Sequence, residues 1–362
     1  MNISIVVGTR PEIIKMSPII RECQRIDTEF FVLHTGQHYS YSMDKVFFEQ
    51  LGLPDAKYNL DVESGTHAEQ TGRMMIGLER ILKREAPDVI LVEGDTNTVL
   101  SAALVASKLG LPIGHVEAGL RCYCKHMPEE INRVLVDHCS DLLFAPTNNS
   151  QENLLNEGIS RHKIFVTGNT IVDSIYDSLK MIKGPLANIY EQRKDLAKDY
   201  ILATVHRQEN TDSREKLRGI ISGLNMVNEI FGLKIILPVH PRTRNQLKVD
   251  NIKTRGVTLI APLDYFSFLL LENSAKVILT DSGGVQEEAC VLGVPCVTLR
   301  DNTERPETLK IGANLLAGTN PLEIVEKVGL MLESEANWAN PYGDGNAAKR
   351  ILDLTRKYWE FA

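Results

Sequence analysis

Short apolar segments alternate with longer amphipathic segments along the whole chain. Segments such as Ile3–Val7 and Val89–Val92 are nearly continuous runs of aliphatic residues, which is typical of strands buried on both faces. Helical periodicity separates most of these segments, for example at Val99–Leu109, which Gly110 and Pro112 end. The predicted strands are residues 3–7, 30–34, 89–92, 113–116, 142–145, 164–167, 200–205, 234–239, 257–260, 276–280 and 295–299. Strands separated by single helices predict βαβ units and a parallel, doubly wound sheet.

The predicted strands fall into two series. Between them, a helical pattern over Val172–Ile182 leads into Gly184-Pro185 and a charged stretch that reaches Asp199, which is typical of an inter-domain connection. We therefore expect an N-terminal domain over residues 1–170, a connection over 171–198 and a C-terminal domain over 199–345. The last helix, residues 346–362, is expected to pack back on the first domain. Two such domains facing each other leave a cleft at the carboxyl ends of their strands, where ligands of α/β folds bind.

Composition excludes several classes of protein. The 362 residues are 43% hydrophobic and 24% charged, which is ordinary for a globular protein. The formal net charge of −7 argues against a nucleic-acid surface, so an anionic ligand must be met by local basic residues. No apolar run approaches the roughly 18 residues of a membrane span, and the N-terminus lacks the features of a signal peptide. We expect a cytoplasmic protein whose six cysteines are reduced.

The segment from Ile278 to Ala289 carries the sharpest local signal. Its apolar beginning predicts a short strand, Ser282-Gly283-Gly284 a tight turn, and the following residues a helix. A strand, a glycine turn and a helix start bring free backbone N–H groups and a positive dipole end to one point, which suits a phosphate group. Glu287 and Glu288 follow one turn into the helix, where a carboxylate is better placed to accept hydrogen bonds from a ribose diol. The alternative is an ordinary turn followed by surface glutamates.

A second anion-binding segment is predicted where the first strand ends. Thr9 and Glu12 have the spacing of a capping box, with Pro11 in the first helical turn. Arg10 and Lys15, on the same helix start, can reach a diphosphate beside it. The alternative is a capped helix with solvated cations.

Carboxylates follow two further strands of the first series. Asp95 and Glu117 each come directly after a predicted strand, and two more acids follow Pro128 at the start of a helix. Acids gathered at one edge of a sheet raise each other's pKa, which is how general acids and bases are tuned. The alternative is that they cap helices, as Asp95 could, or pair with Arg121 and Arg133.

The second domain offers a histidine and a further cation. His206 follows a predicted strand with Arg207 and Asn210 nearby, where it can hydrogen-bond a phosphate or shuttle a proton. Arg305 lies in the loop after the strand at 295–299 and is available to an anionic ligand. A structural histidine and a plain surface loop are the alternatives.

The pair Cys122 and Cys124, with His126, could be taken for part of a metal site. No second pair of ligands follows at zinc-finger spacing, so free thiols are the better interpretation and no metal is expected.

Taken together, these segments resemble the non-hydrolysing UDP-N-acetylglucosamine 2-epimerases. They occur in the order of that family and span nearly the whole chain. The matching segments are residues 8–12 (GTRPE), 94–96 (GDT), 117–121 (EAGLR), 128–133 (PEEINR), 206–210 (HRQEN), 281–288 (DSGGVQEE) and 303–306 (TERP).

The resemblance implies a GT-B-type pair of Rossmann-like domains, a homodimer, and UDP held mainly by the second domain. It implies reversible inversion at C2 of UDP-N-acetylglucosamine, giving UDP-N-acetylmannosamine through elimination of UDP and a 2-acetamidoglucal intermediate, without a cofactor. Glu129 is preferred to Glu130 because it comes first after Pro128, and successive helical residues point about 100° apart. The implied catalytic residues are Asp95, Glu117, Glu129 and His206. The implied UDP-binding residues are Arg10, Lys15, Ser282, Gly283, Gly284, Glu288 and Arg305.

Departures from the family pattern concern the sugar. Glu93 and the Cys122–His126 segment differ from the common pattern and could suit a modified substrate, such as a UDP-linked 2,3-diacetamido uronic acid. The residues after Gln37 differ from those of the bacterial enzymes that the substrate also activates allosterically, so the resemblance does not imply such activation here. A GT-B glycosyltransferase is a second class of function, and a non-catalytic nucleotide-sugar sensor a third. The acids at 117 and 129 favour the epimerase, because a transferase need not remove a carbon-bound proton.

Overall fold

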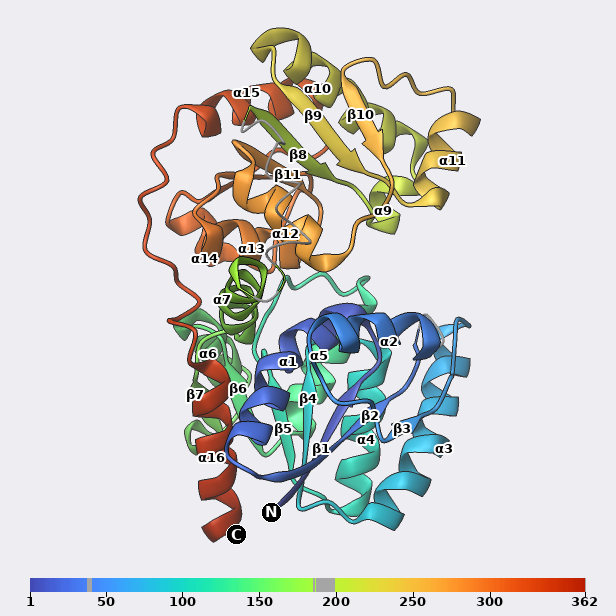
Figure 1. Cartoon of the computed structure of the whole chain (residues 1–362), viewed down its shortest axis with the longest axis vertical. Coiled ribbons are helices and arrows are strands. Elements are labelled where there is room, and N and C mark those ends of the chain that lie inside the picture. The colour runs from blue at the N-terminus through green and yellow to red at the C-terminus, as the bar shows by residue number, and fades with distance from the viewer. Residues whose placement is uncertain (38–40, 185, 187–198, 362) are drawn as a thin grey trace. The chain divides into compact units, whose positions relative to one another are not determined.

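The computed structural model describes residues 1–37, 41–184, 186 and 199–361. The chain divides into two compact units, which we call the first unit (Met1–Asp177 with Tyr342–Ala362) and the second unit (Ser178–Pro341) (Figure 1). Helix α7 (Thr170–Lys183) runs from one into the other. The rest of the predicted connection, residues 185 and 187–198, lies outside the described residues, as do residues 38–40 of the segment that departs from the family pattern after Gln37.

The first unit is built on a parallel sheet of seven strands in the order β3-β2-β1-β4-β5-β6-β7. The order reverses between β1 and β4, which is the switch point of a doubly wound sheet. The strands are β1 (Asn2–Val7), β2 (Glu29–His34), β3 (Tyr58–Asn59), β4 (Val89–Glu93), β5 (Ile113–Val116), β6 (Leu142–Ala145) and β7 (Ile164–Val166).

Helices connect these strands and return at the end of the chain. Helix α16 (Ala347–Phe361) contacts α1 (Arg10–Arg25) and lies beside it in Figure 1. Asp173 fixes the start of α16 by accepting the N–H groups of Ala347 and Ala348 at 3.2 and 3.0 Å. Burial raises the pKa of Asp173 to about 6. The helices are α1 (Arg10–Arg25), α2 (Tyr41–Gln50), α3 (His67–Glu85), α4 (Asn97–Leu109), α5 (Pro128–Cys139), α6 (Asn148–Asn156) and α16 (Ala347–Phe361), with a 3₁₀ turn at Arg161–Lys163.

The second unit repeats the plan with a parallel sheet of six strands in the order β10-β9-β8-β11-β12-β13. Its switch point lies between β8 and β11. The strands are β8 (Tyr200–Thr204), β9 (Lys234–Pro238), β10 (Val257–Ile260), β11 (Val277–Thr280), β12 (Cys296–Thr298) and β13 (Asn314–Leu316). The helices are α9 (Gln208–Thr211), α10 (Arg214–Phe231), α11 (Pro241–Val249), α12 (Tyr265–Ser274), α13 (Gly283–Leu292), α14 (Pro306–Lys310) and α15 (Pro321–Leu332).

The sheet of the second unit is buried on both faces. Alternate residues of its strands enter two separate cores: Ile201 and Ala203 pack with α10 and α15, whereas Tyr200 and Leu202 pack with α12 and α13. Because successive strand residues point to opposite faces, both sets must be apolar, which produces the continuous apolar runs in the sequence.

The predicted fold class is confirmed: both sheets are parallel, and helices separate most of their strands. Every predicted strand is present within two residues of its expected bounds. The strands β3 and β13 were not predicted, because both are short and contain an asparagine (Tyr58-Asn59 and Asn314-Leu315-Leu316), so neither forms a continuous apolar run. Within the described residues, no helix combines the length and apolarity that a membrane crossing needs.

Candidate active site

In the first unit, the predicted site segments meet at the switch point. Strands β1 and β4 are neighbours, so the loops after Val7 and Glu93 leave the same edge of the sheet. Gly8 must be glycine here, since a Cβ would lie 2.1 Å from Thr98 Oγ1 and 2.2 Å from Thr35 Oγ1. This packing holds the start of α1 close against the start of α4.

Glu12 forms hydrogen bonds to both loops, the one after β1 and the one after β4. The predicted capping box is confirmed: Glu12 Oε2 accepts the N–H groups of Gly8 (2.5 Å) and Thr9 (3.2 Å). Its other oxygen accepts the hydroxyl of Thr96, the N-cap of α4. Burial raises the pKa of Glu12 to about 7, against the opposing effect of these hydrogen bonds. The N-cap of α4 is Thr96 and not Asp95, since the Thr96 hydroxyl accepts the N–H of Val99 (3.4 Å).

Glu117 forms the centre of a buried polar cluster in the first unit. It follows β5 with φ of 68°, a left-handed conformation that is uncommon outside glycine and often marks functional residues. Its Oε2 accepts the Lys15 ammonium and the Asn169 side-chain amide, the latter at 2.9 Å. Lys15 also lies 3.4 Å from Glu93 Oε1. Lys15 thus bridges two carboxylates, although it was predicted as a diphosphate ligand.

Glu93 is a member of this cluster that we did not assign to the site from the sequence. It is the last residue of β4 and is 2% exposed. Burial raises its pKa well above the usual range; Lys15 opposes this effect, and Glu117 adds to it. A charged residue directly after the apolar run Val89–Val92 was the available signal.

Asp95 is paired on the same edge. Its carboxylate accepts the Arg133 guanidinium, and its carbonyl accepts the Asn132 amide at 2.9 Å. The alternative that the acids pair with Arg121 or Arg133 therefore holds for Asp95, and it also holds for Glu130, whose Oε2 lies 3.1 Å from Arg133 Nη1. It does not hold for Glu117, because Arg121 pairs with Glu157 (2.6 Å) and Asp137 (2.7 Å).

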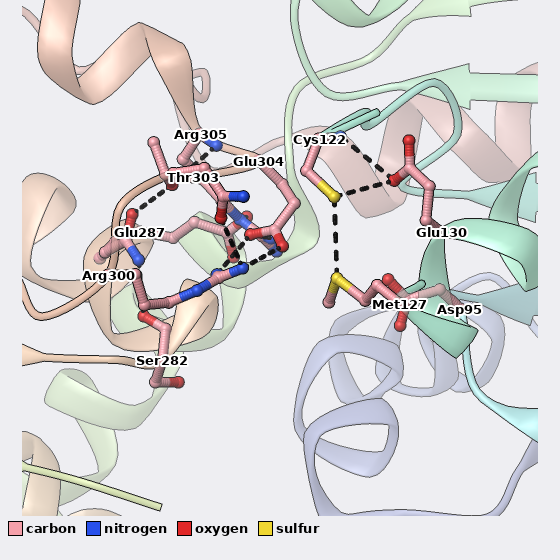
Figure 2. Close-up of polar contacts among 12 residues, drawn as sticks. Asp95, Cys122, Met127, Glu130, Ser282, Glu287, Arg300, Thr303, Glu304 and Arg305 are labelled. Atoms are coloured by element: carbon pink, nitrogen blue, oxygen red, sulfur yellow. Dashed lines mark hydrogen bonds and ion pairs between the residues drawn. The ribbon is translucent and has the colours of Figure 1, made fainter. Parts of the chain in front are cut away.

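The two acids after Pro128 differ in their surroundings. Glu130 is buried and accepts the backbone N–H groups of Cys122 (3.1 Å) and Tyr123 (2.7 Å), so it fixes the loop before α5 (Figure 2). Cys122 Sγ lies 3.3 Å from Glu130 Oε2. Glu129 is half-buried, and its carboxylate has no hydrogen bond or ion pair within the described residues. Glu129 is thus the acid of the two that is available to a ligand.

Arg10 lies at the start of α1 and is partly exposed. Its Nε is 3.2 Å from Asp44 Oδ1, and its guanidinium carbon lies 4.8 Å from the centre of the Phe47 ring. These contacts hold the Arg10 guanidinium at the edge of the sheet where Gly8 also lies.

In the second unit, Asp281 organises the switch point. It is fully buried after β11 and accepts the backbone N–H groups of His206 (3.1 Å) and Arg207 (3.0 Å) and the Asn210 amide (3.1 Å). His206 Nδ1 lies 3.3 Å from Asp281 Oδ1, while the imidazole is 56% exposed. His206 is therefore oriented by Asp281 and remains accessible.

The predicted phosphate segment forms the start of α13. Ser282 is its N-cap, and Gly283 and Gly284 are its first two residues. Arg305 lies directly over Gly283, where a Cβ would come within 2.6 Å of Arg305 Nη1. A guanidinium beside a helix N-terminus combines two features that bind phosphate groups.

Acidic neighbours hold Arg305 in this position. Glu287 Oε1 accepts Arg305 Nε at 2.8 Å, and Glu304 lies 3.4 Å from Nη1 (Figure 2). Glu304 is itself bound by both terminal nitrogens of Arg300 at 3.0 Å. Glu288, the next residue of α13, is 7% exposed.

Among the residues that the structure describes, no group of three or more histidine, cysteine, aspartate or glutamate side chains is arranged to hold a metal ion.

Comparison with known proteins places these segments in one family. The sequence profile of the UDP-N-acetylglucosamine 2-epimerase family matches residues 21–356. A UDP-N-acetylglucosamine 2-epimerase of Methanocaldococcus jannaschii is 52% identical over 360 residues, 98% of each chain. A UDP-2,3-diacetamido-2,3-dideoxy-D-glucuronate 2-epimerase of Pseudomonas aeruginosa is 41% identical, covering 99% of this chain and 100% of that protein.

The fold agrees with the same family. The crystal structure of Methanocaldococcus jannaschii UDP-GlcNAc 2-epimerase in complex with UDP-GlcNAc and UDP matches with a TM-score of 0.93 and 51% identity, covering 99% of this chain and 100% of that chain. The two parallel α/β sheets are thus those of a GT-B-like epimerase fold. The chain belongs to the UDP-N-acetylglucosamine 2-epimerase family.

Proposed function

We propose that this protein interconverts UDP-N-acetylglucosamine and UDP-N-acetylmannosamine. The observation that carries the proposal is Glu117, a buried carboxylate in a left-handed backbone conformation, held by Lys15 and Asn169 beside the switch point of a chain of this family. The relative from Methanocaldococcus jannaschii, 52% identical over nearly the whole chain, bears the name of this activity.

The reaction requires removal and return of a proton on carbon. A base takes the C2 proton while the C1–O bond breaks and UDP leaves with its bonding electrons, giving a 2-acetamidoglucal. UDP then adds back to C1, and C2 receives a proton on the opposite face. One group must act as base and another as acid, and their roles exchange in the reverse direction.

We assign this proton transfer to the carboxylates Asp95, Glu117 and Glu129. Glu117 and Asp95 are fixed by Lys15 and Arg133, which holds each at a defined position. Glu129 remains available to a ligand. Glu130 is assigned to the loop instead, because it binds two backbone N–H groups there.

The UDP moiety is assigned to the second unit. The start of α13, from Ser282 to Gly284, would bind the diphosphate together with Arg305. His206, exposed and oriented by Asp281, would donate a hydrogen bond to the departing phosphate. Glu288 would accept a ribose hydroxyl. Arg10 is proposed to bind the diphosphate as well, whereas Lys15 is not, because it bridges Glu93 and Glu117.

A modified UDP-sugar is the second candidate. The relative from Pseudomonas aeruginosa, 41% identical over its full length, is named for a UDP-linked 2,3-diacetamido uronic acid. The two substrates share UDP and C2 chemistry, so the same carboxylates would serve both.

We also propose a cytoplasmic homodimer. Ile131 and Leu135 lie one turn apart on α5 and are 50% and 44% exposed, which suits burial against a second copy. Light scattering of Ile131→Glu tests this: the variant should be monomeric where the parent protein is dimeric. A monomeric parent protein would contradict the proposal.

The function is tested by incubating the protein with each sugar nucleotide alone and separating the products. The proposal expects UDP-N-acetylmannosamine from UDP-N-acetylglucosamine, reaching the same equilibrium from either side. Turnover of only the diacetamido substrate would favour the second candidate. Consumption that requires an added acceptor would identify a glycosyltransferase.

A further inference from the structure

Gln286 is a buried residue of the phosphate segment to which the proposed function gives no role. It lies in the first turn of α13, and its side chain is fully buried. Burying an amide costs free energy unless its oxygen and its nitrogen are both hydrogen-bonded. The partners of this amide therefore show which parts of the molecule it holds in place.

The two ends of the Gln286 amide bind different segments of the second unit. Its Oε1 accepts the hydroxyl of Thr303 at 2.6 Å, and Asn314 Nδ2 lies 3.3 Å from the same oxygen. Its Nε2 donates to the carbonyl of Ser282, the N-cap of α13, at 3.2 Å. Because donors face one atom of the amide and a carbonyl faces the other, these contacts determine which atom is oxygen and which is nitrogen.

Thr303 connects Gln286 to the backbone of Arg305. Its hydroxyl oxygen accepts the backbone N–H of Arg305 at 3.1 Å (Figure 2). A backbone N–H can only donate, so the hydroxyl gives its own proton to Gln286. The hydrogen bonds thus run in one direction, from the Arg305 N–H through the Thr303 hydroxyl to the Gln286 amide, and from there to the N-cap of α13. They join the two segments that are assigned to the diphosphate.

The orientation of Gln286 is fixed from the side of the sheet. Asn314, the first residue of β13, is fully buried and accepts the hydroxyl of Thr298 on the neighbouring strand β12 at 2.9 Å. Its amide nitrogen, which faces Gln286, also donates to the hydroxyl of Thr308 at 3.1 Å. Asn314 is therefore locked in one orientation, and it keeps the Gln286 oxygen directed toward Thr303.

Arg305 is held against α13 through its side chain as well as its backbone. Glu287 Oε1 accepts Arg305 Nε at 2.8 Å, and the guanidinium covers Gly283, where a Cβ would lie 2.6 Å from Nη1. An arginine side chain has many rotamers, and ordering it costs free energy at the moment of binding unless the order already exists. The bond from Thr303 fixes the backbone from which this side chain extends.

We propose that Gln286 is a positioning residue for the diphosphate: it fixes the loop at Thr303, so that Arg305 lies in place over the start of α13 before UDP binds. The inference rests on the proposed function of Arg305 and of the segment from Ser282 to Gly284. A guanidinium that is already ordered loses little freedom on binding, so the preformed site binds the diphosphate more tightly. Loss of the Gln286 or Thr303 side chain therefore acts on UDP through Arg305.

A double-mutant cycle followed by calorimetry with UDP tests this route. Thr303 is half-buried, so Thr303→Val removes its hydroxyl with little change in volume. It should raise the Kd of UDP about fivefold, the factor for one ordinary hydrogen bond. Arg305→Ala should raise the Kd about tenfold or more, the factor for a charge-assisted bond. In the Arg305→Ala background, Thr303→Val should change the Kd less than about twofold. Two effects that multiply in full would overturn the proposal.

Conservative variants separate positioning from packing. Thr303→Ser keeps the hydroxyl and should bind UDP within about twofold of the parent protein. Gln286→Met fills the space without an acceptor and should weaken UDP binding as much as Thr303→Val, with no further loss when the two are combined. The matched control is Thr355→Val, which removes a buried hydroxyl that donates to the Ile351 carbonyl (2.7 Å) in the first unit and should leave the Kd unchanged. Circular dichroism establishes that each variant is folded.

The remaining outcomes distinguish this inference from the proposed function. A folded Thr303→Ser protein that binds UDP as weakly as Thr303→Val would overturn the role of the hydroxyl, and a Gln286→Met protein that binds like the parent would overturn the role of Gln286. The Thr303 variants decide the question even where Gln286→Met does not fold. No binding of UDP to the parent protein, or no effect of Arg305→Ala, would contradict the proposed function and the inference with it.

Discussion

Replacing Lys15 with methionine tests the buried cluster of the first unit. The ammonium lies 3.4 Å from Glu93 and in contact with Glu117, and all three side chains are at most 8% exposed. Methionine keeps most of the volume but leaves two carboxyl groups without their cation. Removing one partner of a buried ion pair costs about 3–5 kcal/mol, because the remaining charge is neither solvated nor paired.

This cost depends on pH with a definite sign. A carboxyl group whose folded-state pKa is raised above its unfolded value loses stability as the pH rises, because the folded state must release a proton at a cost. Glu93 is already such a group, and Lys15 opposes the shift. Without Lys15 the shift grows. The deficit of Lys15→Met should therefore be about 3–5 kcal/mol near pH 8 and smaller near pH 5, because Glu93 takes up a proton as the pH falls.

Urea unfolding followed by circular dichroism at both pH values measures this difference. Lys83, which pairs with Glu79 on the surface at 2.6 Å, supplies the matched control, and Lys83→Met should change stability little at either pH. The double variant Lys15→Met/Glu93→Gln removes one of the two carboxylates that lose their cation, so it should recover part of the lost free energy of unfolding. A deficit that is the same at both pH values would refute the assignment of Lys15 as the charge partner of these acids.

Three further predictions concern single residues. Gly283→Ala should displace Arg305 and weaken UDP binding, measured by calorimetry, by about 1.5–3 kcal/mol, the range for a charge-assisted hydrogen bond. If the effects of Gly283→Ala and Arg305→Ala were fully additive in a double-mutant cycle, Gly283→Ala would not act through Arg305. Because the pKa of Glu12 is raised from 4.5 to about 7, the parent protein should lose about 3 kcal/mol of stability as pH rises between these values, and Glu12→Gln should flatten that slope in urea unfolding. An unchanged slope would show that Glu12 is not the group responsible. Asp95→Asn should lower turnover by about 10² or more while UDP affinity stays within a few-fold, and a rate equal to that of the parent protein would remove Asp95 from the chemistry.

The fold could be predicted because its strands are buried on both faces. Strands such as Val89–Glu93 and Leu142–Ala145 therefore consist mainly of apolar residues, and their bounds can be predicted from the apolar run alone. The capping box of Thr9 and Glu12 could also be predicted from the sequence, because it depends on two residues only three positions apart.

The pairing within the site could not be predicted in the same way. Lys15 meets Glu93 and Glu117 because the sheet order places β1, β4 and β5 side by side, and no local pattern encodes which side chains then touch. Local sequence identified the residues at the strand ends, and tertiary packing determined their partners.

The central claim is that this protein removes and returns the proton at C2 of a UDP-sugar. The most direct test is incubation with UDP-N-acetylglucosamine in deuterated buffer, followed by proton NMR of the sugar. The proposed function predicts UDP-N-acetylmannosamine carrying deuterium at C2, and Glu117→Gln should abolish both the product and the exchange. Formation of the product with the original proton retained at C2, or no exchange with either candidate substrate, would contradict it.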